Sequence, residues 1–188
     1  MNLPNKLTII RMIITPVYLA VFLWESLPYR FFIAAAIFII GSITDTLDGR
    51  IARKHNLITN FGKLADPLAD KMLTTAALLV FMKLGLCSIW VIMIVLAREF
   101  AVTSVRLVAS SQGVVIPANN WGKIKTVSQM VFSILIMILG GFNELNMLPE
   151  AFNFPLVSNI LLWITAVLTI ISGGTYLWES RNLIDYSK

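Results

Sequence analysis

The chain is poor in the residues that build disulfides and thiolate or imidazole metal sites, and it is poor in charge. It contains one cysteine, Cys87, and one histidine, His55. One cysteine cannot form an intrachain disulfide, and a metal site made of several thiolates or imidazoles is excluded by the same count. Charged residues make up 13% of the chain, whereas soluble domains carry about 25%. These shortages argue against a soluble globular domain.

Apolar residues are abundant instead. They make up 57% of the sequence, and the mean hydropathy is +0.81. A membrane-spanning helix requires about 20 residues, so a chain of 188 residues accommodates six passes and no separate soluble domain. The apolar segments run over 8–24, 31–47, 68–84, 88–109, 124–142 and 156–178. We therefore expect one all-α domain over residues 1–188, a polytopic integral membrane protein with six transmembrane helices.

The placement of lysine and arginine predicts the orientation. With a cytoplasmic N-terminus, six passes put all but two of the 15 basic residues, Arg30 and Lys83, on or near the cytoplasmic side. Both termini are therefore expected to be cytoplasmic in a multi-pass protein of the cell membrane. The net charge of +5 forms no basic tract, so it favours anionic headgroups and phosphate substrates as partners rather than nucleic acid.

Four aspartates interrupt this apolar chain within one short stretch. Asp45 and Asp48 are three residues apart, and Asp66 and Asp70 are four apart. Each pair would share one face of a helix. A carboxylate near hydrocarbon is costly unless it is compensated, and a cluster of carboxylate oxygens suits Mg²⁺ or Mn²⁺. The spacing therefore predicts a metal site that handles phosphate groups near the cytoplasmic interface.

The stretch from residue 45 to residue 70 resembles the signature of the CDP-alcohol phosphatidyltransferases. It reads D-x-x-D-G-x-x-A-R, eight residues, then G-x-x-x-D-x-x-x-D. The resemblance implies a membrane enzyme that moves a phosphatidyl group from CDP-diacylglycerol to an alcohol and releases CMP at the cytoplasmic face. It also implies two Mg²⁺ ions per active site, with Mn²⁺ as an alternative, and a homodimer.

The resemblance assigns roles to individual residues. Asp45, Asp48, Asp66 and Asp70 would be metal ligands, and Asp70 would also be the general base. Other roles would also explain the residues around the donor. Gly49 and Gly62 could serve helix packing, and Arg53 could anchor the chain in the membrane. The N-terminal residues could cap a helix or anchor it at the interface. The residues expected around the donor nucleotide are Asn5, Thr8, Arg11, Gly49, Ala52, Arg53 and Gly62.

A downstream polar set is similar to the bacterial phosphatidylglycerophosphate synthases, a branch of this family. Its members are Arg98, Glu99, Arg106, Lys123, Lys125 and Thr126. In that branch the acceptor is glycerol 3-phosphate, and the planar fork of arginine suits its phosphate. Membrane anchoring is the alternative for the two lysines. For Arg98 and Glu99 the alternative is a buried structural ion pair.

Three other functions compete with this interpretation. A sister branch of the family would use inositol phosphate, serine or phosphatidylglycerol as acceptor, and the aspartate motif does not separate these. An aspartate-rich membrane prenyltransferase also binds diphosphate through metal ions, but without the pattern of Gly49, Ala52 and Arg53. A divalent-cation transporter would place its acids near the bilayer midplane, often in repeated halves.

Overall fold

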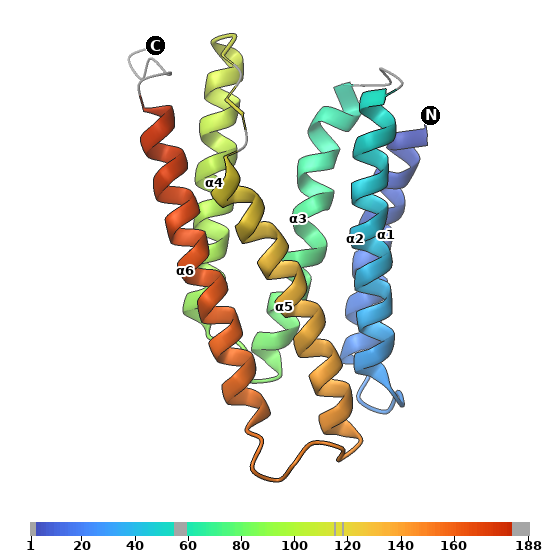
Figure 1. The fold of residues 1–188 in the computed structure, drawn as a ribbon. Helices are drawn as coiled ribbons and strands as arrows, with labels where there is room; N and C mark the ends of the chain where they lie inside the picture. The colour runs from blue at the N-terminus through green and yellow to red at the C-terminus, as the bar shows by residue number, and fades with distance from the viewer. Residues whose placement is uncertain (1–2, 55–59, 115, 118, 182–188) are drawn as a thin grey trace. The chain divides into compact units, whose positions relative to one another are not determined.

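The computed structural model describes the backbone of residues 3–54, 60–114, 116–117 and 119–181, and it describes their side chains except at 3–7, 45–54, 60–68 and 70. Within these ranges the chain forms helices and connecting segments without a strand (Figure 1). The helices are α1 (Leu3–Leu23), α2 (Arg30–Lys54), α3 (Asn60–Lys83), α4 (Ile89–Ser111), α5 (Asn120–Glu144) and α6 (Phe154–Ser180). The predicted all-α class is confirmed.

Each predicted apolar segment coincides with one of these helices, but two predicted boundaries are wrong. α2 continues to Lys54, seven residues past its predicted end, and α3 begins at Asn60, eight residues before its predicted start. Hydropathy detects only the apolar part of a helix, whereas the backbone hydrogen bonds continue through polar residues. The aspartate motif therefore lies on two helices, and Pro67 lies inside α3.

Two of the described helices are long and apolar enough to cross a membrane. They are α5 and α6, with mean hydropathies of 1.7 and 2.1 over their most apolar windows. The apolar parts of α1 and α2, Thr8–Leu23 and Arg30–Thr44, are shorter. The finding supports membrane association, and the six passes and the orientation of the termini stay predictions.

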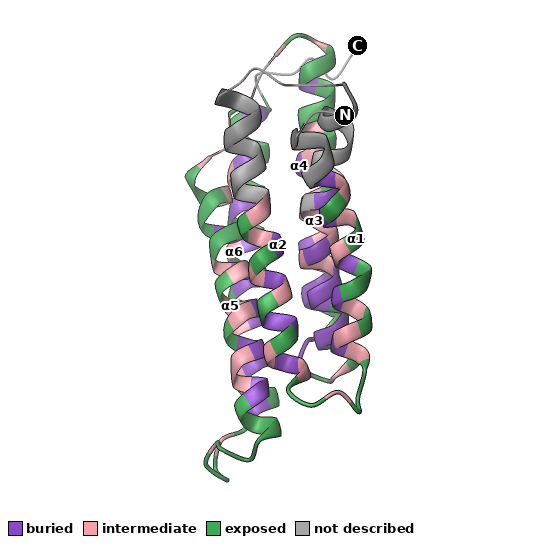
Figure 2. Ribbon diagram, turned by 90° about the vertical axis from the view of Figure 1, so that its right-hand side faces the viewer, coloured by how far each residue is buried: buried purple, intermediate pink, exposed green. Residues whose placement is uncertain are grey.

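The chain divides into two compact units. The first comprises Met1–Leu84 and Ser133–Phe154, and the second comprises Gly85–Phe132 and Pro155–Lys188, so α5 begins in the second unit and ends in the first. Buried residues recur along the helices every three or four positions, with exposed residues between them (Figure 2). This is the spacing that one buried stripe on each helix requires.

In the first unit, α1 packs against both α2 and α3. The core of this unit is aromatic: the ring of Phe22 lies edge-on to those of Phe31 and Phe81, with centroids 4.9 and 6.1 Å away. At one end of the unit, Arg30 Nε donates to Glu144 Oε1 at 3.0 Å. This ion pair joins the first residue of α2 to the last residue of α5.

Two adjacent glycines let α5 approach α2 closely. A β-carbon at Gly140 would lie 2.3 Å from the ring of Phe31, and one at Gly141 would lie 2.5 Å from the ring of Phe32. Neither distance is compatible with a real contact, so both positions require a residue that has no side chain. Gly174 on α6 differs, because a β-carbon there would meet nothing within 4 Å.

Cys87 lies between α3 and α4 and is buried. Burial raises the pKa of its thiol to about 12, because an apolar environment disfavours the thiolate. The thiol is therefore protonated at neutral pH, which disfavours a nucleophilic role.

The glycine contacts generate the first prediction. Gly140→Ala should destabilise the protein by about 1–3 kcal/mol, because the new methyl group overlaps the Phe31 ring in a packed core. Gly174→Ala is the matched control, and alanine there should be neutral or stabilising by up to about 1 kcal/mol. Thermal unfolding of both variants in one detergent measures the difference. Equal melting temperatures would contradict the close packing of α5 on Phe31.

Candidate active site

The aspartate motif occupies the facing ends of two consecutive helices. Asp45 and Asp48 belong to the C-terminal part of α2, and Asp66 and Asp70 belong to the N-terminal part of α3. These two helix ends lie at the same end of the first unit (Figure 1). The helical backbone that the spacing argument required is therefore present at all four positions. The motif side chains themselves lie outside the described residues, as do those of Asn5, Gly49, Ala52, Arg53 and Gly62.

The donor set of the motif fits a hard divalent cation. Four carboxylates, at helical spacings of three and four residues, provide only oxygen ligands, which Mg²⁺ and Mn²⁺ prefer. Among the residues with described side chains, no group of three His, Cys, Asp or Glu could hold a metal ion. Metal binding by the motif stays a prediction.

Thr8 and Arg11 lie in the first half of α1 and are almost inaccessible to solvent. Their exposed fractions are 0% and 2%. The Thr15 hydroxyl donates to the Arg11 carbonyl at 3.1 Å, a bond within the helix. A buried arginine is costly unless it meets an anionic or polar partner. Interfacial anchoring, which needs exposure to headgroups, therefore explains these two residues poorly.

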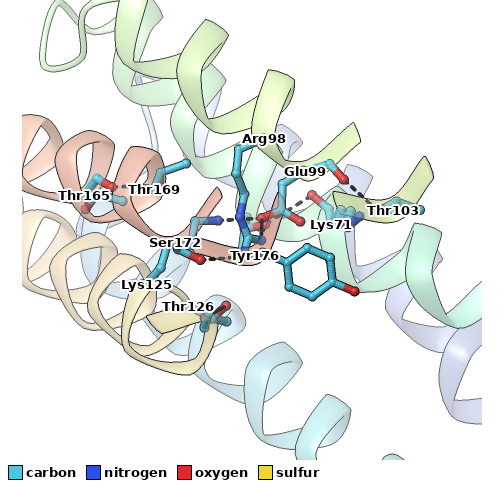
Figure 3. A network of polar contacts seen from close by, with 12 residues as sticks. Lys71, Arg98, Glu99, Thr103, Lys125, Thr126, Thr165, Thr169, Ser172 and Tyr176 are labelled. Carbon is cyan, nitrogen blue, oxygen red and sulfur yellow. Dashed lines mark hydrogen bonds and ion pairs between the residues drawn. The ribbon is translucent and has the colours of Figure 1, made fainter. Parts of the chain in front are cut away.

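A second polar cluster lies inside the second unit and joins α4 to α5. Glu99 Oε1 accepts from Arg98 Nη1 at 2.9 Å and from Lys125 Nζ at 2.7 Å (Figure 3). The side chains of Arg98, Glu99 and Lys125 are only 12%, 18% and 4% exposed. Arg98 and Glu99 thus form a part-buried ion pair, as the structural alternative expected, and Lys125 shares its carboxylate oxygen.

Helix α6 completes this cluster with residues that the sequence argument missed. Arg98 Nη2 donates to the Ser172 hydroxyl at 2.6 Å, and Arg106 Nε donates to the Tyr176 hydroxyl at 3.1 Å. Both bonds follow the same chain order, so α4 and α6 run parallel. The signal was present as hydroxyl residues every three or four positions along an apolar helix, all at most 2% exposed: Thr165, Thr169, Ser172, Tyr176 and Ser180.

The start of α5 is also tied to α6. Asn119 Oδ1 accepts from the Gly122 amide at 2.8 Å, as a helix cap does. Its Nδ2 donates to the Thr175 hydroxyl at 3.1 Å. A β-carbon at Gly122 would lie 3.4 Å from Arg98 Nη2, and one at Gly173 would lie 3.0 Å from Arg98 Cγ. The two glycines therefore leave room for the arginine between α5 and α6.

The structure divides the predicted acceptor residues into two groups. Arg98, Glu99 and Lys125 form the internal network just described, which we call the Glu99 network. Arg106 and Lys123 are exposed. Thr126 is exposed, and its hydroxyl donates to the Gly122 carbonyl at 3.0 Å within α5. Glu99 accepts from two cations, and Arg106 and Lys123 add exposed positive charge to the same unit, which favours anions.

Helices throughout the described part of the chain, four clustered aspartates and a polar network with exposed positive charge are typical of a membrane enzyme that works on phosphates. The profile of the family described as CDP-alcohol phosphatidyltransferase matches residues 1–171. The chain belongs to this family, and the resemblance predicted from the motif is confirmed.

Individual relatives match almost end to end. A Bacillus subtilis (strain 168) protein named CDP-diacylglycerol–glycerol-3-phosphate 3-phosphatidyltransferase is 40% identical over 95% of this chain and 96% of its own length. A protein of the same name from Rickettsia bellii (strain RML369-C) is 40% identical over 93% of both chains. A probable phosphatidylglycerophosphate synthase of Mycobacterium tuberculosis (strain ATCC 25618 / H37Rv) is 35% identical over 94% of this chain and 80% of its own.

The Glu99 network generates the second prediction. Glu99→Gln should lower the free energy of unfolding by about 3–5 kcal/mol, with a value near 3 expected. The substitution leaves two largely buried cations without their shared anion. Glu144→Gln is the matched control. It removes the carboxylate from a pair that is 15% and 33% exposed, and such a pair contributes about 0–1 kcal/mol. Thermal or denaturant unfolding in detergent compares the two. A Glu99→Gln protein as stable as Glu144→Gln would contradict the structural role of the network.

Proposed function

We propose that this protein transfers the phosphatidyl group of CDP-diacylglycerol to glycerol 3-phosphate, giving phosphatidylglycerophosphate and CMP. The observation that carries the proposal is the end-to-end similarity to relatives whose names state this activity. The positive cluster of the second unit supports it, because glycerol 3-phosphate brings a phosphate dianion. Serine, the acceptor of a sister enzyme, brings no phosphate to such a cluster.

The aspartate motif is the place for the donor and the metal ions. Asp45, Asp48, Asp66 and Asp70 would hold two Mg²⁺ ions, or Mn²⁺ in their place. When bound, such ions neutralise the pyrophosphate charge that repels an incoming oxygen. The positions of the aspartates towards the ends of α2 and α3 suit an interfacial site better than the midplane site of a cation transporter.

The reaction is a direct displacement. The acceptor hydroxyl oxygen bonds to the β-phosphorus of the donor, the bond from that phosphorus to the CMP oxygen breaks, and CMP leaves. Asp70 takes the proton of the acceptor hydroxyl on a carboxylate oxygen. A carboxylate of ordinary pKa, near 4, is a weak base at neutral pH, so Asp70 depends on its position beside the hydroxyl.

The remaining predicted residues are divided between the two substrates. The residues for the donor nucleotide and phosphates are Asn5, Thr8, Arg11, Gly49, Ala52, Arg53 and Gly62. The residues for the acceptor are Arg98, Glu99, Arg106, Lys123, Lys125 and Thr126, of which Arg106 and Lys123 offer exposed positive charge.

The protein works in the cell membrane as a six-pass homodimer with both termini and the active site on the cytoplasmic side. The length and hydropathy of α5 and α6 support this setting. So does the surface of α6, where Leu156, Ile160, Val167 and Ile170 are each at least half exposed. Lipid tails accommodate such a surface, whereas water does not.

The third prediction tests the function directly. Purified protein incubated with CDP-diacylglycerol and Mg²⁺ should release CMP when glycerol 3-phosphate is added, and the lipid product should carry both phosphates. Inositol phosphate, serine and phosphatidylglycerol are the comparison acceptors, and CMP release with each should be at least about 100-fold slower, since a site built to pair with one polar group rejects analogues that leave its buried groups unpaired. CMP release that follows another acceptor would reassign the enzyme to a sister branch.

The fourth prediction concerns the metal. Stripping divalent ions with EDTA should abolish CMP release, and Mg²⁺ or Mn²⁺ should restore it. Asp45→Asn should need at least about 10-fold more Mg²⁺ for half-maximal rate, because it removes one charged ligand. Glu150→Gln, which changes an exposed acid outside the motif, is the control and should keep the original Mg²⁺ dependence. Full turnover of the stripped enzyme in EDTA would refute the metal-assisted mechanism.

A further inference from the structure

Arg106 is held by a single tyrosine of α6. Its Nε donates to the Tyr176 hydroxyl at 3.1 Å, and its guanidinium carbon lies 5.3 Å from the centre of the Tyr176 ring. Tyr176 is 2% exposed, whereas Arg106 is exposed. The buried, rigid ring of Tyr176 thus holds the inner side of the Arg106 guanidinium, while the rest of that side chain reaches solvent.

The two arginines of α4 use their nitrogens differently. Arg98 donates hydrogen bonds from both terminal nitrogens inside the protein, from Nη1 to Glu99 and from Nη2 to Ser172. Arg106 donates only from Nε, and its Nη1 and Nη2 have no partner among the described residues. These two nitrogens form the edge with which arginine binds two oxygens of one phosphate. Arg106 is therefore the arginine of this cluster that is equipped to bind an external phosphate in this way.

We infer that Tyr176 is a positioning residue for the phosphate of the acceptor. Its hydroxyl and ring hold Arg106 so that the Nη1–Nη2 edge faces the phosphate before the substrate arrives. The inference rests on the proposed function, because it assumes a phosphate-bearing acceptor at this cluster. An arginine held in its binding conformation loses less side-chain freedom when the ligand binds, so the hydroxyl of Tyr176 strengthens acceptor binding without touching the acceptor.

The fifth prediction is a change in one Michaelis constant. Tyr176→Phe removes only the hydroxyl and keeps the buried ring. The KM for glycerol 3-phosphate should rise about 3- to 10-fold, the size expected for one hydrogen bond. The KM for CDP-diacylglycerol and kcat should stay within about twofold, because the donor is held by the aspartate motif. Arg106→Gln should raise the KM for glycerol 3-phosphate further, by about 10- to 150-fold, since it removes a charge-assisted bond.

Two comparisons separate positioning from general damage. In the Arg106→Gln background, Tyr176→Phe should have no further effect, because the tyrosine acts only through the arginine. Thr169→Val is the matched control: Thr169 is buried on the same helix, and its hydroxyl donates to the Thr165 carbonyl at 2.7 Å. This variant should keep both Michaelis constants of the wild type. A purely structural tyrosine would instead lower the melting temperature and disturb both substrates alike.

The outcomes also distinguish this inference from the proposed function. If the wild-type enzyme releases CMP with glycerol 3-phosphate and Tyr176→Phe leaves that KM unchanged, the positioning role is overturned and the function stands. Additive effects of the two substitutions would overturn it as well. If the wild-type enzyme does not use glycerol 3-phosphate, the proposed function itself fails, and the inference fails with it.

Discussion

The pairing of buried charge in an apolar chain is the constraint on which the rest of the described structure depends. Glu99 satisfies it in the second unit, where one carboxylate oxygen accepts from both Arg98 and Lys125. Two largely buried cations would be costly without this anion. The shared oxygen also joins α4 to α5, so the same contact that stabilises the charges holds two helices together around the cluster.

Helix α6 extends this arrangement and separates internal from outward-facing charge. Ser172 takes one nitrogen of Arg98, and Gly122 and Gly173 leave the space in which that arginine lies. Arg106 lies two turns after Arg98 on α4, where Tyr176 accepts from its Nε, and its side chain is exposed. The exposed charge of Arg106 is thus separate from the ion pairs that Glu99 makes inside the unit.

Much of the fold and the metal motif could be predicted because both depend on local patterns. Apolar runs located each of the helices, and the spacing of the four aspartates required the helical backbone that α2 and α3 provide. The boundaries at Lys54 and Asn60 escaped prediction because hydropathy records burial in lipid rather than backbone hydrogen bonding. The family followed from the motif, since eight positions there match the family signature at set offsets.

The sequence by itself determined the helical class, the family and the charged residues that are candidates for binding phosphates and metal ions. Only the tertiary structure decided which of those charges are internal and which are available. Ser172 and Tyr176 bond to arginines 74 and 70 residues away, whereas the similar hydroxyls of Thr165 and Thr169 bond within their own helix. A hydroxyl in an apolar helix can do either, and the choice depends on whether the packing of another helix brings a donor within reach.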